Sequence, residues 1–306
     1  MKVVFMGTPE FASIALSRLL EDGHDVAAAF TKPDKPFGRK KIITPSAVKV
    51  NAIENNIPVY QPKSLKNSEQ IDILTKINPD IITVVAYGQI LPKEILEIPR
   101  YGCVNVHASL LPKYRGASPI QTSILNGDEV TGVTTMYMSE GLDTGDIIKT
   151  AETKIGKNET ASELFTRLAP MGADLLCQTL SEIENGTARR LPQNDEEATY
   201  APILTKNIAK IDFSAPSQVV HHLVCGLSEW PCAYCYLGEK KLKVYKSSLN
   251  DEYFGRPGEI LSSKKFIVGC KTGAVEFVEV QLEGKKKMPA RDFLNGNMAK
   301  KGTVLN

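Results

Sequence analysis

The sequence predicts two domains: an α/β domain built on a Rossmann-like, doubly wound parallel sheet, followed by a small all-β domain, an OB-like barrel. Apolar runs and helical patterns alternate over roughly the first 180 residues, an order typical of a parallel sheet with helices on both faces. The later part carries short alternating segments between glycine-containing turns, as small barrels do. A length of 306 residues also suits two domains better than one.

The elements of the first domain follow from the placing of its apolar residues. The patterns predict strands at residues 3–6, 26–30, 80–87, 103–106 and 133–138. They predict helices at residues 11–19, 46–54, 69–77 and 164–184. Pro9 suits the first turn of the earliest helix, whereas Pro170 should kink or break the last one.

The second domain begins after a polar stretch. We expect an α/β domain at 1–188, a linker at 189–207 that contains Pro192 and Pro202, and a β-domain at 208–306. The patterns predict a short helix at 217–227 and strands at 234–237, 241–245, 258–261, 266–268 and 275–281.

Charge is distributed unevenly between the two parts. From Thr205 onward the chain has 16 Lys and Arg against 10 Asp and Glu, whereas the remainder has 21 against 25. A basic second domain suggests a polyanionic partner such as a nucleic acid, and a solubilising surface is the alternative.

No apolar run approaches the ~18 residues needed to cross a bilayer, and the first residues lack a secretory pattern. We therefore expect a cytoplasmic protein without a membrane partner. The six cysteines fit a reducing compartment. Cys232 and Cys235 form the one close pair, which is weak evidence for zinc and fits a strand better.

Two short segments contain candidate catalytic groups. Asn105 and His107 lie two apart on a predicted strand, so both side chains share one face and can together stabilise an oxyanion. Asp143 follows in a glycine-rich segment, and a carboxylate beside the imidazole would favour its charged form. The alternatives are a hydrogen-bonded core histidine and an ordinary Asp-Gly turn. No Gly-x-Ser-x-Gly motif, Walker loop or complete dinucleotide fingerprint is present.

Taken together, these residues resemble the folate-dependent formyltransferase family. The resemblance rests on Asn105-x-His107, the following Ser-Leu-Leu-Pro and the distance to Asp143. It implies that Asn105, His107 and Asp143 are catalytic. It also implies that a folate pocket is lined by Ser109, Leu110, Leu111, Pro112, Gln89, Ile90 and Leu91.

Further features resemble the branch of this family that acts on charged tRNA. They are the opening Gly7-Thr-Pro-Glu-Phe, a basic loop at 31–41, Trp230-Pro231, Arg256-Pro-Gly-Glu and the tail around Arg291. A basic loop can contact phosphates, and the alternative is a solvated surface turn with no binding role. The expected tRNA contacts are Lys32, Lys35, Arg39, Lys40, Lys41, Lys285, Lys286 and Lys287.

The resemblance implies transfer of the formyl group of 10-formyltetrahydrofolate to the methionine on initiator tRNA. We expect a monomer, and we expect no metal because the sequence offers no cluster of ligands. Asn105 and His107 would stabilise the oxyanion, and Asp143 would hold His107 charged and move the proton. Glycinamide ribonucleotide or an amino-sugar nucleotide are alternative acceptors. A formyltetrahydrofolate hydrolase and a non-catalytic RNA-binding protein also remain open.

Overall fold

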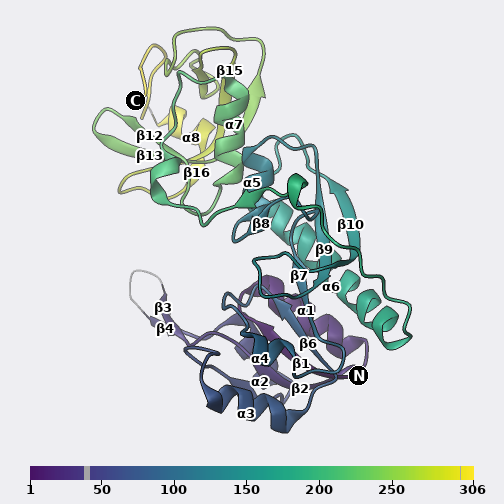
Figure 1. Ribbon diagram of the computed structural model, residues 1–306. Helices are drawn as coiled ribbons and strands as arrows, with labels where there is room; N and C mark the ends of the chain where they lie inside the picture. Colours follow the sequence, from purple (N-terminus) through teal and green to yellow (C-terminus); the bar gives the residue numbers. More distant parts are fainter. Residues whose placement is uncertain (38–41, 297) are drawn as a thin grey trace. The chain divides into compact units, whose positions relative to one another are not determined.

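The computed structural model describes residues 1–37, 42–296 and 298–306 and divides into two compact units (Figure 1). The first unit comprises Met1–Gly116, Gly132–Thr153 and Phe165–Tyr200. The second comprises Ala117–Thr131, Lys154–Leu164 and Ala201–Asn306. The units interleave along the chain, and the continuous boundaries expected from the sequence stay a prediction.

A seven-stranded sheet forms the centre of the first unit, in the order β10-β9-β7-β6-β1-β2-β5. The strands are β1 (Lys2–Gly7), β2 (Asp25–Phe30), β5 (Val59–Tyr60), β6 (Ile81–Val85), β7 (Cys103–His107), β9 (Val130–Tyr137) and β10 (Ile147–Lys154). The pairs from β5 to β7 are parallel, whereas β9 runs antiparallel to β7. The predicted strands of this domain are confirmed, but the sheet is mixed at this edge.

Helices cover both faces of this sheet (Figure 1). They are α1 (Glu10–Glu21), α2 (Ala47–Glu54), α3 (Ser68–Ile77), the short α4 (Lys93–Leu96) and α6 (Ala161–Glu184). Val4 and Met6 of β1 join one core cluster with Leu74 of α3 and Ile95 of α4. Because the whole of β1 from Val3 onward is buried, its sequence lacks the alternation of a half-exposed strand.

The long helix α6 continues through Pro170, so the expected break does not occur. Proline removes one helical hydrogen bond, but the apolar stripe of α6 is fully buried on either side of it. Leu164, Leu168, Leu176 and Leu180 are all 0% exposed. Their packing outweighs the local cost of the proline. Of the described helices, none is long and apolar enough to span a membrane.

The second unit contains a five-stranded sheet in the order β12-β13-β15-β14, with β16 beside β15. The bounds are β12 (Tyr234–Leu237), β13 (Lys240–Asn250), β14 (Ile267–Gly269), β15 (Ala274–Leu282) and β16 (Met288–Pro289). The strand predicted at 258–261 is wrong, because Glu259 and Ile260 form only isolated bridges. The remaining predicted strands are confirmed, and the closure of an OB-like barrel stays a prediction.

Three helices accompany this sheet: α5 (Pro119–Leu125), α7 (Ser217–Gly226) and α8 (Ala290–Asn295). The helix predicted at 217–227 is α7, whereas α8 was not predicted because it is short. Phe293 of α8 stacks on Phe266, with ring centroids 5.6 Å apart. Two-stranded ladders complete the fold: β3 (Lys35–Phe37) with β4 (Ile42–Thr44), and β8 (Arg115–Gly116) with β11 (Tyr200–Ala201).

Buried His221 on α7 joins distant parts of the second unit. Its Nε2 lies 2.8 Å from the carbonyl oxygen of Lys157, and its Nδ1 lies 2.9 Å from Oγ of Ser247 on β13. A carbonyl can only accept, so Nε2 carries the proton and Nδ1 accepts from the hydroxyl. Burial lowers the pKa of His221 below its usual value, although the Lys157 carbonyl opposes this shift.

We expect the second unit to lose stability as the pH falls from about 7 to 5. The unfolded chain, with an ordinary histidine pKa of about 6.5, then binds a proton that the folded protein disfavours, a slope of up to ~1.4 kcal/mol per pH unit. The unfolding of this unit can be followed by fluorescence of Trp230, the single tryptophan. The His221→Asn variant should show a flatter pH dependence; parallel curves for the two proteins would contradict this role.

Candidate active site

Strand β7 presents two polar side chains near its carboxyl end. Asn105 pairs with Val84 of the parallel strand β6, and His107 pairs with Thr134 of β9. Both side chains are buried, with 9% and 6% of the residue exposed. Since alternate residues of a strand share a face, Asn105 and His107 face the same side of the sheet.

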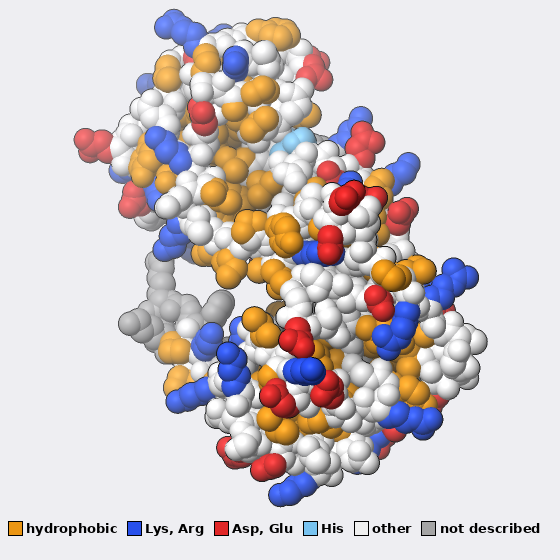
Figure 2. Space-filling view, viewed as in Figure 1, with side chains coloured by type: hydrophobic (Ala, Val, Ile, Leu, Met, Phe, Trp, Pro, Cys, Tyr) orange, Lys and Arg blue, Asp and Glu red, His pale blue; other side chains and the backbone are white. Residues whose placement is uncertain are grey.

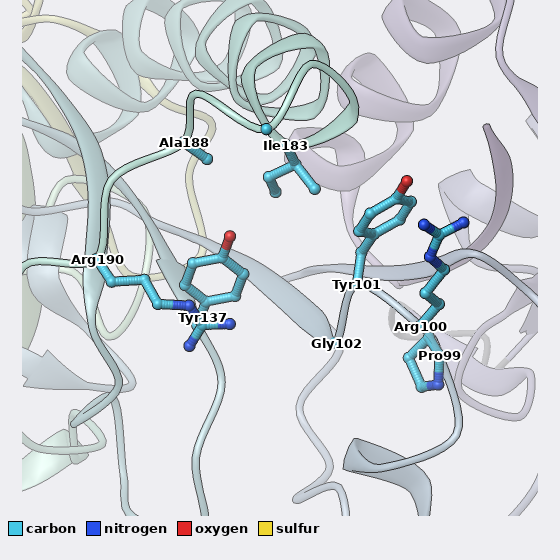
Figure 3. Close-up of a pocket in the computed structure, with 9 residues that line it drawn as sticks. Pro99, Arg100, Tyr101, Gly102, Tyr137, Ile183, Ala188 and Arg190 are labelled. Atoms are coloured by element: carbon cyan, nitrogen blue, oxygen red, sulfur yellow. The ribbon is translucent and has the colours of Figure 1, made fainter.

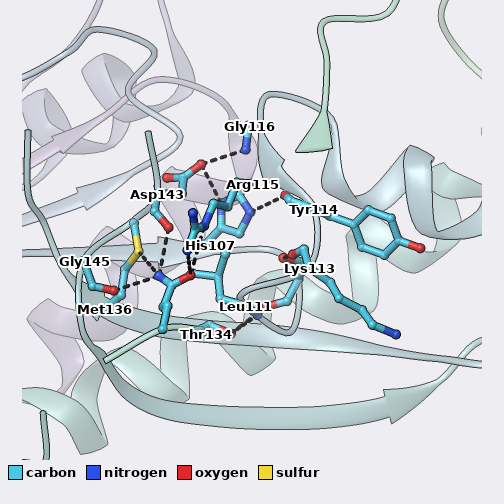
Figure 4. A network of polar contacts seen from close by, with 12 residues as sticks. His107, Leu111, Lys113, Tyr114, Arg115, Gly116, Thr134, Met136, Asp143 and Gly145 are labelled. Atoms are coloured by element: carbon cyan, nitrogen blue, oxygen red, sulfur yellow. Dashed lines mark hydrogen bonds and ion pairs between the residues drawn. The ribbon is translucent and has the colours of Figure 1, made fainter. Parts of the chain in front are cut away.

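Each nitrogen of the His107 imidazole faces an oxygen atom of another residue (Figure 4). Nε2 lies 2.8 Å from the carbonyl oxygen of Tyr114, and Nδ1 lies 3.7 Å from Oδ2 of Asp143. The Tyr114 carbonyl can only accept, so Nε2 is the protonated nitrogen. Nδ1 therefore faces the carboxylate without a direct hydrogen bond. His107 and Asp143 form an ion pair only when the imidazole is protonated.

Asp143 lies in the loop after β9, with its backbone in the left-handed region at a φ of 52°. Its Oδ2 accepts a 2.8 Å hydrogen bond from the backbone N–H of Gly116. A Cβ on Gly145 would lie 1.7 Å from the carbonyl oxygen of Tyr137, so only glycine fits there. The glycine-rich sequence thus brings the loop tightly against the end of β9.

The Asn105 side chain has no hydrogen-bond partner within residues 1–37, 42–296 and 298–306. The residue is 9% exposed, and its amide atoms are not fully buried, so solvent or a bound molecule can reach them. Asn105 thus leaves an N–H donor for a bound molecule on the same face as His107. The structure therefore offers an amide donor, an imidazole whose Nδ1 can donate when the ring is charged, and a nearby carboxylate, a set suited to a reaction that develops negative charge on oxygen.

The segment after β7 is held mainly by its own polar groups. Oγ of Ser109 donates to the carbonyl of Lys113 at 2.6 Å, and Oγ1 of Thr134 donates to the carbonyl of Ser109 at 2.6 Å. The Leu111–Pro112 peptide bond is cis, and Leu111 is buried. With its hydroxyl engaged in this way, Ser109 shapes the backbone here, while Leu110 and Leu111 supply apolar surface.

The other predicted folate segment follows β6. Gln89 donates from Nε2 to the carbonyl of Pro62 at 3.0 Å, Ile90 is 78% exposed, and Leu91 is buried. The hydroxyl of Tyr87 is buried and finds no partner in the described part of the chain. Gly88 has a positive φ of 75° that favours glycine. The two segments follow the adjacent parallel strands β6 and β7, so they meet at one edge of the sheet.

The predicted basic contacts are only partly described. Lys32 lies against Gly88, and burial together with the nearby Lys35 lowers its pKa. Lys35 begins the hairpin of β3 and β4, which projects from the first unit (Figure 1). Arg39, Lys40 and Lys41 lie outside the described residues.

In the second unit, Lys285, Lys286 and Lys287 are exposed. Lys287 forms a 2.7 Å ion pair with Glu279 and lies 4.5 Å from the ring centre of Tyr245. On the face drawn in Figure 2, basic and acidic side chains are interspersed in each unit.

The sequence analysis missed two residues that support the site. Arg115 is 2% exposed, and its guanidinium donates to Oε1 of Gln193 and to Oδ1 of Asp195. Gln193 in turn donates to backbone carbonyls of the Asp143 loop. Gln193 lies in the stretch predicted to be a linker, where the sequence shows no periodic pattern. The one signal in the sequence was Arg115 itself, a charged residue a few positions after the predicted catalytic His107.

The chain matches known families over almost its whole length. Residues 1–180 match the formyl transferase family, and residues 203–298 match the formyl transferase C-terminal domain. The chain belongs to the formyl transferase family. The methionyl-tRNA formyltransferase of Clostridioides difficile is 48% identical and that of Alkaliphilus oremlandii 47% identical, each across 100% of this chain and at least 99% of the relative.

Solved structures of formyl transferases share the fold. WlaRD, a sugar 3N-formyl transferase, superposes with a TM-score of 0.71 at 23% identity, covering 94% of this chain and 99% of its own. An N-formyltransferase from Helicobacter canadensis gives a TM-score of 0.69 at 21% identity, covering 94% of this chain and 100% of its own. At this identity the likeness concerns the fold alone.

A separate hollow of about 380 Å³ lies in the first unit (Figure 3). Its walls include Gly102, just before β7, and Tyr137, at the end of β9, with Arg190 stacked 3.7 Å from the Tyr137 ring centre. Gly102 and His107 lie at opposite ends of β7. The formyl transferase site is therefore not this hollow, because ligands of parallel sheets bind beyond the carboxyl ends of the strands.

The predicted cysteine pair is buried. Cys235 lies in β12, as expected for a strand, whereas Cys232 lies before it at a φ of 67°. Burial raises the pKa of Cys235 to about 12, so its metal-binding thiolate is scarce at neutral pH. Within residues 1–37, 42–296 and 298–306, no group of three His, Cys, Asp or Glu side chains is suited to a metal ion.

We expect the substitutions Asn105→Ala, His107→Ala and Asp143→Ala each to lower the rate of formyl transfer by at least ~10²-fold, the typical loss for one oxyanion donor. Steady-state kinetics and circular dichroism of the purified variants would test this. The exposed amide of Asn185 provides a control, since Asn185→Ala should keep full activity. A folded Asp143→Ala protein with near-normal turnover would contradict the assignment.

Proposed function

We propose that this chain transfers the formyl group of 10-formyltetrahydrofolate to the amino group of methionine carried by initiator tRNA. The product would be N-formylmethionyl-tRNA for translation initiation, which places the protein in the cytoplasm. The observation that carries the proposal is the 47–48% identity to methionyl-tRNA formyltransferases across the entire chain. The arrangement of His107 and Asp143 supplies chemistry of the kind that this transfer needs.

The site has features that fit a folate carrying a formyl group. Leu91 and Leu111 supply apolar side chains in the segments that follow β6 and β7, and the amide of Asn105 on β7 has free hydrogen-bonding capacity. A planar heterocycle with several polar atoms needs such a mixture of surfaces. These residues would hold the donor with its formyl group toward Asn105 and His107. No metal is needed for this reaction.

Attack of the amine on the formyl carbon moves negative charge onto the formyl oxygen. Nε2 of His107 is engaged by Tyr114, so the Nδ1 edge is the one that remains for this oxygen. Asn105 would donate a second hydrogen bond from the same face. Because both donors are held in place before the reaction, they need little reorganisation when the charge develops.

The amine must also lose a proton. Oδ2 of Asp143 accepts from Gly116, whereas Oδ1 has no hydrogen-bond partner within the described residues. We assign Oδ1 the role of receiving the proton, directly or through a water, and of returning it to the folate nitrogen. Asp143 would therefore stabilise the imidazolium through one oxygen and act as a base through the other.

The tRNA would be bound through phosphates by the basic residues of the 31–41 segment and by Lys285 and Lys286. Lys287 is already paired with Glu279, so its contribution should be smaller. This assignment is supported by the excess of basic residues after Thr205. We propose that the active protein is a monomer.

Comparing acceptors tests the proposed reaction most simply. Radiolabelled 10-formyltetrahydrofolate would be mixed with methionine-charged initiator tRNA, free methionine, glycinamide ribonucleotide or an amino-sugar nucleotide. We expect label only on the charged tRNA. Label on a small acceptor would overturn the acceptor while keeping the chemistry. Release of labelled formate alone would instead indicate a hydrolase.

We expect the triple substitution of Arg39, Lys40 and Lys41 by alanine to raise the KM for tRNA with little change in kcat. It should also reduce the dependence of binding on salt, because fewer counterions are released. A triple variant of the exposed Lys63, Lys66 and Lys76 makes the same charge change elsewhere and should bind normally. Equal tRNA affinity in both triple variants would rule out the basic segment as a contact.

A further inference from the structure

We infer that Gln193 and Arg115 are positioning residues for the catalytic residues Asp143 and His107. In this inference residues 193–199 form a strap that holds both of them in place. The inference rests on the proposed function and deepens it. All residues involved belong to the first unit. Gln193, at one end of the strap, bonds to the backbone of Asp143. Thr199, at the other end, bonds to Tyr114, whose carbonyl accepts from His107.

The amide of Gln193 is fully engaged. Nε2 donates to the carbonyl oxygens of Asp143 at 2.8 Å and Gly145 at 2.7 Å. Oε1 accepts two hydrogen bonds from Arg115, from Nε at 3.1 Å and Nη2 at 2.9 Å. Carbonyls can only accept and a guanidinium can only donate, so the orientation of this amide is unambiguous. Gln193 thereby holds the backbone of the loop on both sides of Thr144, at Asp143 and at Gly145.

Arg115 fixes Gln193 in turn. Its side chain is 2% exposed, and a buried guanidinium is stable only when its donors are satisfied. Gln193 and Asp195, whose Oδ1 lies 2.8 Å from Nη2, accept from Nε and Nη2 and both come from one short stretch of chain. The neighbouring N–H of Gly116 donates to the Asp143 carboxylate. Asp143 is thus held through its backbone by Gln193 and through its side chain by Gly116.

The other end of the strap acts on His107. Thr199 accepts hydrogen bonds from two consecutive backbone N–H groups, through Oγ1 from Tyr114 and through its carbonyl from Arg115, both at 2.9 Å. These bonds hold the backbone of Tyr114 at its positive φ of 62°. The Tyr114 carbonyl accepts from Nε2 of His107. Thr199 consequently fixes the acceptor that orients the imidazole.

Such fixation matters because Asp143 adopts a backbone conformation that L residues disfavour. A φ of 52° persists only when the surroundings hold it. Without the two bonds from Gln193, the loop would relax and move the carboxylate away from Nδ1. A displacement of about 1 Å in a catalytic group can lower the rate about 100-fold.

The substitution Gln193→Glu separates positioning from packing. Glutamate keeps an acceptor for Arg115, but it places a second oxygen against the carbonyls of Asp143 and Gly145. We expect kcat to fall roughly 10- to 100-fold, with the KM values for folate and tRNA nearly unchanged. The exposed Asn185 lies outside the strap and supplies the control, because Asn185→Ala removes an amide that bonds to Ser181 and not to the Asp143 loop.

A double substitution tests whether Gln193 acts through Asp143. In an Asp143→Asn background, adding Gln193→Glu should change kcat less than twofold, since the group it positions is already altered. Full additivity of the two losses would contradict the inference, as would near-normal kcat in Gln193→Glu alone. An unstable but fully active variant would likewise reduce Gln193 to a structural role.

Hydrogen exchange of the peptide that contains residues 139–146 provides a readout independent of activity. Exchange there should speed up in Gln193→Glu and stay unchanged in Asn185→Ala. Unchanged exchange in both variants would overturn the strap. If the wild-type protein formylates no acceptor, the proposed function fails, and this exchange measurement still decides the inference.

Discussion

The hydrogen bond from Nε2 of His107 to the Tyr114 carbonyl determines how the site can work. It fixes the proton on one nitrogen and thereby turns Nδ1 toward Asp143, 3.7 Å away. A freely rotating imidazole would present either nitrogen to the substrate, and the carboxylate would stabilise its charge only part of the time. Thr199 accepts from the backbone N–H groups of Tyr114 and Arg115, through its hydroxyl and its carbonyl respectively, and these two bonds hold the Tyr114 carbonyl in place.

The sheet explains why these groups come together. β6 and β7 are parallel neighbours, so the segments that follow them leave the sheet at the same edge. The reversed strand β9 then brings Thr134 beside His107 and starts the loop that carries Asp143. Local constraints complete the arrangement: Gly145 allows the loop to approach Tyr137, and Gln193 holds the Asp143 backbone.

Much of this was predictable from the sequence, and the misses have physical causes. The buried strands are predictable because burial leaves a local pattern of apolar residues, and the structure brings the predicted His107 and Asp143 within 3.7 Å of each other. The reversal of β9 was not, since direction depends on pairing rather than on composition. Gln193 was assigned to a linker because a polar residue that hydrogen-bonds distant carbonyls has no periodicity. The kink or break predicted at Pro170 is absent because the packing of α6 compensates for the hydrogen bond that proline removes.

The position of the proton on the His107 imidazole determines how the ring can act. Nitrogen NMR of the ¹⁵N-histidine-labelled protein tests this position most directly. We expect a proton on Nε2 at every pH at which the protein is folded, and a change at Nδ1 but not at Nε2 on Asp143→Asn substitution. A neutral imidazole with its proton on Nδ1 would contradict the account, because the Tyr114 carbonyl could not then orient the ring.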